Sequence, residues 1–229
     1  MSSDPAETIR LLSRFAGANL TKTLARIEKD VRGVTTERAA AFMDEAGAGR
    51  TVLAAAGEMK RLASQINVTI HALGILSCLP HILEEGEWVE YVSLGAGNTG
   101  RQFDLETNIR VAEFKFINWR GGAESIRQNS IFKDFFLLAE APTPKRKYLY
   151  LLGTRHALRF LNGGRAISSV LSRGDKVQKL FLQRFGNHYL KARDYFQDHQ
   201  QAVTIVDVSE WLQELQDIAV DEAADETAS

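Results

Sequence analysis

The sequence predicts an α/β fold in which a central mixed sheet is flanked by helices and preceded by an N-terminal helical region. Residues 88–94 are rich in aromatic and β-branched side chains, which favour strands. Residues 103–116 alternate in polarity around a turn, as the two strands of a hairpin do. An amphipathic helix over 123–141 then separates this hairpin from a further strand at 147–152. A sheet with helices between its strands is the simplest arrangement of these elements.

The N-terminal region 1–64 is predicted to be helical. Asp4 and Pro5 have the residue types of an N-cap and a first helical position. A second helix is expected over 36–45, and a third is expected to run from Thr51 into the apolar region 66–83, with an interruption at Pro80. No catalytic pattern occurs here, so this region is interpreted as a helical cap, a dimer surface or a module that binds a partner protein.

The hairpin carries the most informative side chains. Because side chains alternate along a strand, Asp104 and Glu106 are expected to share a face of the first strand. On the second strand, Glu113 and Lys115 share a face with Val111, whereas the alternate positions are apolar. The apolar faces are therefore expected to enter a core, while two carboxylates and an ammonium group converge outside it.

This grouping has a chemical use. The carboxylates of Asp104 and Glu113 are hard oxygen ligands of the kind that Mg²⁺ prefers. A bound divalent cation can activate water and stabilise charge on a phosphoryl oxygen. Lys115, on the same face, can orient that water or offset negative charge in the transition state.

Asp104 followed by Glu113-Phe114-Lys115 resembles the motif of the restriction-endonuclease-like PD-(D/E)xK nuclease superfamily. The resemblance covers roughly residues 65–160, with Phe103 where the family usually has Pro and a short gap before Glu113. It implies a restriction-endonuclease-like core and a magnesium-dependent phosphodiesterase, with Mn²⁺ able to substitute. In such sites the backbone carbonyl of Phe114 would be a further metal ligand.

The same resemblance implies supporting residues on the neighbouring helices. Gln128 matches a glutamine that faces the site in many relatives, although Phe132 stands where the family often has Tyr. Relatives also draw an acid from the helix before the first strand, where Glu84 and Glu85 are the candidates.

A competing motif precedes the hairpin. Gly95, Gly97 and Gly100 form Gly-x-Gly-x-x-Gly after a predicted strand, a pattern found in dinucleotide-binding and methyltransferase folds. Such a site needs a helix that starts at the last glycine. Residues 101–105 alternate like a strand, so a connection beside the site is favoured and no organic cofactor is expected.

Charge is unevenly distributed. Between Thr143 and Arg193 there are twelve Lys or Arg residues against Asp175 alone, whereas 194–229 contains ten acidic residues and no basic ones. A basic stretch attracts phosphates, which favours nucleic acid as the partner and DNA in particular. Within it, Arg155 and Arg159 follow a strand and are the predicted nucleic-acid contacts.

Composition sets the remaining expectations. The 229 residues, 45% of them hydrophobic, suffice for a nuclease-like domain over 65–216 with basic C-terminal helices, followed by an acidic disordered tail over 217–229. The single cysteine, Cys78, excludes an internal disulfide and suits the cytoplasm. Polar residues and Pro80 interrupt the apolar region 66–83, which favours a buried helix over a membrane span. His71 and His81 have no convincing zinc-ligand spacing with Cys78.

These observations predict a metal-dependent nuclease, expected to be a deoxyribonuclease and an endonuclease. Cutting both strands of a duplex usually needs two sites, which a symmetric homodimer would supply. The alternative is a nuclease-like fold without activity that binds nucleic acid or another protein.

Overall fold

The structure, a computed structural model, describes residues 4–95, 102–116, 119, 124–172 and 175–216. The chain divides into two compact units, Met1–Ile66 and Asn67–Ser229. The glycine motif at 95–100 lies outside the described residues apart from Gly95, and the acidic tail from 217 lies outside them entirely.

The N-terminal unit is helical, as predicted. It contains α1 (Pro5–Ala16), α2 (Leu20–Asp30), α3 (Thr36–Glu45) and the first part of α4 (Arg50–Ile82). The predicted cap of α1 is confirmed, because the Asp4 side chain accepts a hydrogen bond from the Ala6 N–H and Pro5 is the first helical residue. Helix α2 was not predicted from the sequence.

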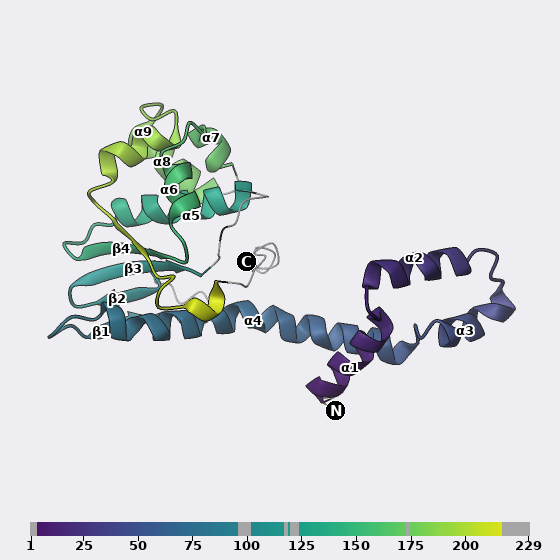
Figure 1. Cartoon of the computed structure of the whole chain (residues 1–229). Helices are drawn as coiled ribbons and strands as arrows, with labels where there is room; N and C mark the ends of the chain where they lie inside the picture. Colours follow the sequence, from purple (N-terminus) through teal and green to yellow (C-terminus); the bar gives the residue numbers. More distant parts are fainter. Residues whose placement is uncertain (1–3, 96–101, 117–118, 120–123, 173–174, 217–229) are drawn as a thin grey trace. The chain divides into compact units, whose positions relative to one another are not determined.

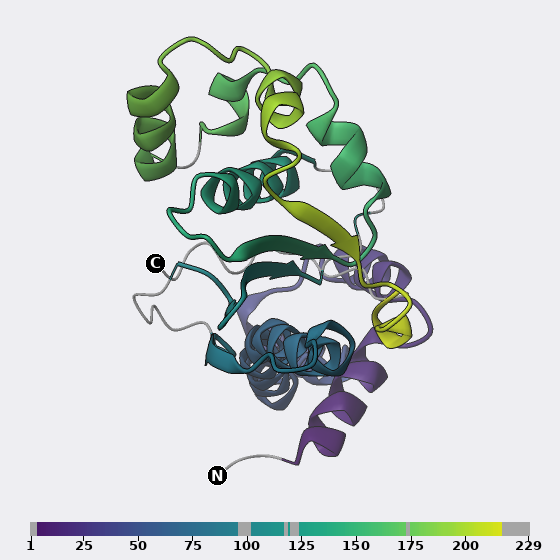
Figure 2. The ribbon, with the colours of Figure 1, turned by 90° about the vertical axis from the view of Figure 1, so that its left-hand side faces the viewer.

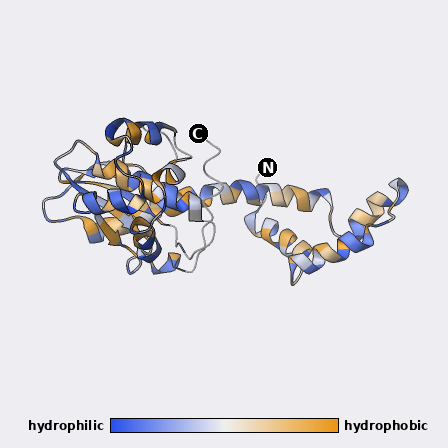
Figure 3. Cartoon of the chain, turned by 90° about the horizontal axis from the view of Figure 1, so that it is seen from above, coloured by the Kyte–Doolittle hydropathy of each residue, from blue (hydrophilic) through white to orange (hydrophobic). Residues whose placement is uncertain are grey.

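Few side chains of this unit are buried. Among its described residues only Thr8 and Ala55 are fully buried, and large apolar side chains such as Ile9, Leu20 and Met43 are exposed. Figure 3 shows apolar and polar residues side by side along these helices. The unit therefore has only a small core of its own among the described residues.

The second unit contains a mixed sheet of five strands, and the predicted α/β class is confirmed (Figure 1). The strands are β1 (Val89–Val92), β2 (Leu105–Thr107), β3 (Arg110–Lys115), β4 (Arg146–Leu151) and β5 (Thr204–Asp207). They lie in sequence order, with β1, β2 and β3 antiparallel and with β4 and β5 parallel to β3. Strand β5 was not predicted, because its four residues are too few to show a clear alternation.

Helices cover both faces of the sheet (Figure 2). The second half of α4 lies on one face and α5 (Glu124–Ala139) on the other. The chain then forms α6 (Arg155–Leu161), α7 (Ile167–Val170), α8 (Asp175–Phe185) and α9 (Ala192–His199), and a 3₁₀ turn over Gln213–Leu215 follows β5.

Each face of the sheet has its own hydrophobic core. Leu105, Ala112 and Phe114 pack against Ile75 and Cys78 of α4. On the opposite face, the larger cluster is formed by apolar side chains of β3, β4, α5 and the C-terminal helices, including Val111, Leu149, Phe132, Phe136 and Phe181. The face that carries Glu113 and Lys115 is therefore covered by α5, and the expectation that these groups lie outside the core is wrong.

Helix α4 continues through Pro80 to Ile82, so the predicted interruption is wrong as well. Only two residues follow Pro80 in the helix, and the missing N–H therefore removes a hydrogen bond only from the last turn. Gly74 allows α4 to approach the sheet closely, because a Cβ there would lie 2.6 Å from the Phe116 ring. By length and composition α4 is the one helix of the described chain that is able to cross a membrane.

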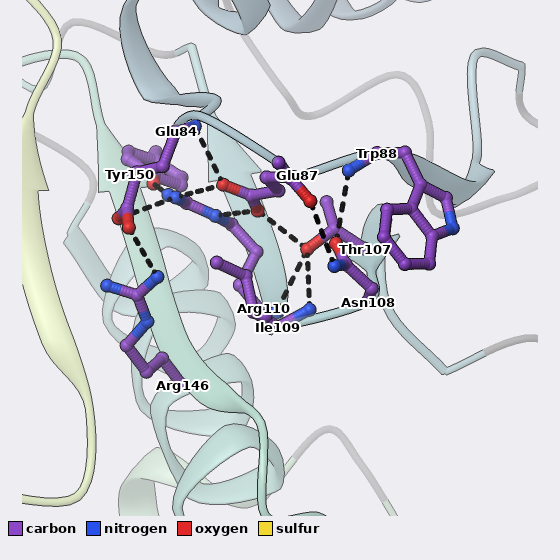
Figure 4. Close-up of polar contacts among 10 residues, drawn as sticks. Glu84, Glu87, Trp88, Thr107, Asn108, Ile109, Arg110, Arg146 and Tyr150 are labelled. Atoms are coloured by element: carbon purple, nitrogen blue, oxygen red, sulfur yellow. Dashed lines mark hydrogen bonds and ion pairs between the residues drawn. The ribbon is translucent and has the colours of Figure 1, made fainter.

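A buried arginine holds the start of β3 (Figure 4). The guanidinium of Arg110 is paired with Glu87 and Glu84 and donates a hydrogen bond of 2.8 Å to the Tyr150 hydroxyl. Thr107 Oγ1 accepts from the Arg110 N–H at 2.9 Å, which confirms the predicted turn of the hairpin. Glu84 is therefore engaged at the opposite end of β3 from Lys115, and its expected place beside the candidate site is wrong.

Candidate active site

The register of the hairpin places Asp104 beside Glu113. Leu105 pairs with Ala112 and Glu106 pairs with Val111, so the residue before β2, Asp104, lies near Glu113. The side chains of Asp104 and Glu113 are hydrogen-bonded to each other. Asp104 also fastens the end of the ladder, because its Oδ2 accepts a hydrogen bond of 3.0 Å from the Phe114 N–H.

Lys115 lies at the end of β3 and contacts an acid that the sequence analysis did not single out. Its Nζ is 3.0 Å from Oδ2 of Asp134 on α5. The charges of Glu113 and Asp104 also act on Lys115. Asp134 occurs in the same helical stripe as Ile131 and Leu138, and a carboxylate within an apolar stripe is a signal that was available in the sequence.

His71 is the second functional candidate that the sequence analysis missed. It lies on α4, and its Nε2 is 3.4 Å from Asp104 Oδ1, while its ring meets the edge of Phe116. His71 shares a helical stripe with Ile75 and Cys78, both of which are buried. The stripe indicates that His71 faces the sheet, but no local pattern connects it with Asp104.

The pKa values of the two neighbouring carboxyl groups, Glu113 and Asp104, are shifted in opposite directions. Burial and the charges of Asp134 and Asp104 raise the pKa of Glu113 well above its ordinary value. Burial also acts to raise the pKa of Asp104, but the hydrogen bond from His71 and the charge of Lys115 outweigh it and hold that pKa below its ordinary value. Because the two groups are hydrogen-bonded to each other and their pKa values shift in opposite directions, a proton shared between them favours Glu113 over Asp104.

Lys115 remains charged in this setting. Burial alone would lower the pKa of Lys115, but the negative charges of Asp134, Glu113 and Asp104 outweigh burial and raise it. The site therefore combines a fixed ammonium group with three carboxyl groups.

Two neighbouring cavities open beside these residues. The smaller, of about 20 Å³, is lined by Lys115, Trp119 and Gly153 among others and has room for one water molecule. The larger, of about 260 Å³, is lined by Trp119 together with Gln128 and residues of α6 and the turn that follows it. Trp119 belongs to both linings and forms the wall between them.

The other predicted site residues lie around this centre. Gln128 is buried and lines the larger cavity rather than the one beside Lys115. Arg159 lines the same larger cavity, and Arg155 is exposed at the first residue of α6. Glu106 instead pairs with Lys145 at 2.9 Å.

The predicted cation ligands consist of oxygen donors. Among the described residues, no three His, Cys, Asp or Glu side chains are arranged to hold a metal ion. Mg²⁺ needs fewer than three such side chains, because it commonly binds through one or two carboxylates and keeps several water ligands. Two carboxyl groups that share a proton fit such a cation, since the cation can replace the proton between them.

The backbone carbonyl of Phe114, the third predicted cation ligand, lies on the same side of β3 as Asp104. The Lys115 carbonyl accepts from the Leu152 N–H at 2.9 Å and so points toward β4. The Phe114 N–H points the other way, toward Asp104. Because the N–H and C=O of one strand residue point to the same side, the Phe114 carbonyl lies on the side of β3 where Asp104 is found.

Comparison of the chain with protein-family models, with curated proteins and with solved structures finds no match.

Proposed function

We propose that this protein is a metal-dependent nuclease that hydrolyses phosphodiester bonds in nucleic acid, with DNA as its substrate. The observation that carries the proposal is the grouping of Asp104, Glu113 and Lys115 at the end of the β2–β3 hairpin. The order of elements also supports a restriction-endonuclease-like core, because a helix, three antiparallel strands, a helix, a parallel strand and a helix follow one another in the chain.

In this proposal Asp104, Glu113 and the Phe114 carbonyl hold Mg²⁺, or Mn²⁺ in its place. The bound cation would stabilise charge on the phosphoryl oxygen and lower the pKa of a water. Glu113 would give up its proton on becoming a ligand, and the lowered pKa of Asp104 favours the ionised form that a ligand needs. His71 supports this state by donating a hydrogen bond to Asp104.

Lys115 positions the attacking water. Its ammonium group borders the cavity of about 20 Å³ that has room for one water. Asp134 holds the ammonium group in place and charged, so Lys115 can donate a hydrogen bond and offset negative charge on the phosphate. Gln128 is proposed to assist from the adjoining cavity, and Arg155 and Arg159 to contact the phosphate backbone.

The test is a cleavage assay on duplex DNA, single-stranded DNA and RNA, with Mg²⁺, Mn²⁺ or EDTA. Lys115→Ala is expected to slow cleavage by about 10²-fold or more, as the loss of one transition-state donor does. Lys133→Ala is the matched control, because Lys133 is an exposed lysine on α5. Cleavage that persists in EDTA, or in a folded Lys115→Ala protein, contradicts the proposal.

Metal binding is tested separately by thermal unfolding. A ligand that binds only the folded state raises the midpoint of unfolding. Mg²⁺ is therefore expected to raise it in the wild type and to have little effect in Asp104→Asn or Glu113→Gln. Equal shifts in all three proteins would place the cation elsewhere.

One observation favours the inactive, nucleic-acid-binding alternative. The Lys115 ammonium group is already engaged by Asp134, which leaves fewer of its hydrogen-bond donors for water or phosphate. This alternative predicts that the wild type and Lys115→Ala both bind DNA in a salt-sensitive way. It also predicts that neither protein cleaves DNA in the presence of Mg²⁺ or Mn²⁺.

A further inference from the structure

The larger cavity beside the candidate site has the chemistry of an anion site. It is lined by Trp119, Gln128, His156, Arg159, Arg165 and the Gly163–Gly164 turn. Neither Arg159 nor Arg165 forms an ion pair within the described part of the chain, whereas Arg110, Arg146 and Arg184 are all paired. Among the described residues that line this cavity there is no carboxylate. Two guanidinium groups without an ion-pair partner among the described residues therefore line this space.

A buried donor points to a ligand independently of these charges. Trp119 is only 8% exposed, and its indole Nε1 has no hydrogen-bond partner among the described residues. Leaving a buried N–H without a partner costs about 1–3 kcal/mol. Trp119 lines this cavity, and a bound molecule whose hydrogen-bond acceptor reaches the indole N–H would satisfy it.

Aromatic side chains line part of the cavity. The Trp119 ring lies 5.8 Å from the His156 ring and 6.4 Å from that of Phe160. Aromatic walls of this kind hold nucleobases by stacking. The buried Gln128 side chain also lines this cavity and adds a polar group to it.

We propose that this cavity binds a nucleoside phosphate, namely one nucleotide of a nucleic-acid strand that lies in the candidate active site. Arg159 and Arg165 hold the phosphate, and the base rests against Trp119 and His156. That the nucleotide belongs to a strand about to be cut rests on the proposed nuclease function, but the binding itself does not.

The proposal makes single-stranded nucleic acid the preferred ligand. A base within a duplex is stacked and paired, and it has to leave the helix before it can enter a cavity of this kind. Because unpairing and unstacking cost a few kcal/mol, a single strand is expected to bind at least tenfold more tightly than the duplex of the same sequence.

The fluorescence of Trp119 reports directly on this cavity. The chain has three tryptophans, and Trp88→Phe with Trp211→Phe leaves Trp119 as the only one. Deoxyadenosine monophosphate is expected to change the emission saturably, whereas inorganic phosphate and deoxyadenosine are each expected to bind at least tenfold more weakly. If the double variant does not fold, titration calorimetry of the wild-type protein with the same three ligands replaces it.

Arg159→Ala and Arg165→Ala are each expected to weaken deoxyadenosine monophosphate binding at least tenfold, and Lys133→Ala to leave it unchanged. For a short single-stranded oligonucleotide, we likewise expect Arg159→Ala and Arg165→Ala to weaken binding and Lys133→Ala to leave it unchanged. A site that binds inorganic phosphate as well as the nucleotide, an equal loss in Lys133→Ala, or no saturation at all would overturn the proposal.

Binding in EDTA separates this inference from the proposed function. If the nucleotide site is real, the wild type binds deoxyadenosine monophosphate in EDTA whether or not it cleaves DNA in the presence of Mg²⁺. Nucleotide binding without DNA cleavage would refute only the nuclease proposal. DNA cleavage without nucleotide binding would refute only the proposal that this cavity binds a nucleotide.

Discussion

Lys115 and Asp134 form an ion pair in which Nζ and Oδ2 are 3.0 Å apart, although the two residues belong to different elements. Lys115 ends β3, and Asp134 lies on the helix that covers that face of the sheet. The Lys115 side chain is 24% exposed and that of Asp134 is 8% exposed, so the pair is largely shielded from water. Asp134 therefore determines where the ammonium group of the motif can lie.

A double-mutant cycle measures the energy of this pair. Breaking a fully buried pair costs about 3–5 kcal/mol, and because Lys115 is partly exposed we expect about 2 kcal/mol for Lys115→Met or Asp134→Asn alone. The double variant should lose less than the sum, since it leaves no unpaired charge. Urea unfolding provides the measurement, and strictly additive losses would show that the two groups do not interact.

The raised pKa of Glu113 predicts a dependence of stability on pH. A carboxyl group whose pKa is higher in the folded than in the unfolded chain contributes stability below its unfolded pKa, and that stability is lost as pH rises through the folded pKa. Glu113→Gln removes this loss of stability, so without metal the variant should be more stable than the wild type at pH 8 and equally stable near pH 4.

The control for this experiment is Glu28→Gln, since Glu28 is exposed on α2. It should not alter the pH profile. A profile of Glu113→Gln that parallels the wild type at every pH would mean that Glu113 titrates as an ordinary carboxyl group.

His71 is predicted to act through Asp104. Its hydrogen bond opposes the effect of burial and helps to hold the pKa of Asp104 below the ordinary value. His71→Ala should therefore raise the pKa of Asp104, which carbon NMR of the side-chain carboxyl can follow during an acid titration. His81→Ala is the matched change on the same helix, because His81 stacks on Trp211 and should leave Asp104 unaffected. An unchanged Asp104 pKa in His71→Ala would rule out this role.

Two arginines that share Glu84 should differ sharply in their effect on stability. Arg110 is 3% exposed and is also paired with the fully buried Glu87 side chain, so Arg110→Met should cost about 3–5 kcal/mol. Arg146 is 48% exposed, and Arg146→Ala should cost at most about 1 kcal/mol. Urea unfolding of both variants tests this contrast. Similar losses of unfolding free energy would mean that burial does not make the Arg110 ion pair more important for stability than the Arg146 ion pair.

Local patterns were sufficient for most of the elements that build the site. The hairpin was predictable because its alternation and its Thr107-Asn108 turn are both encoded in consecutive residues, and its register then brings Asp104 near Glu113. The helix α5 was predictable from the spacing of Ile131, Phe135 and Leu138. Strand β5 was not predictable, since a strand of four residues is recognised only by its pairing with β4.

The sequence by itself determined which chemistry this protein can offer, because Asp104, Glu113 and Lys115 are brought together by one short hairpin whose geometry depends on local alternation. Only the tertiary structure decided the environment of these groups. Asp134 and His71 come from helices on opposite faces of the sheet, and packing against those helices buries Glu113 and sets the pKa values of both carboxyl groups. Burial and long-range charge depend on which elements meet in space, and no spacing within a single segment contains that information.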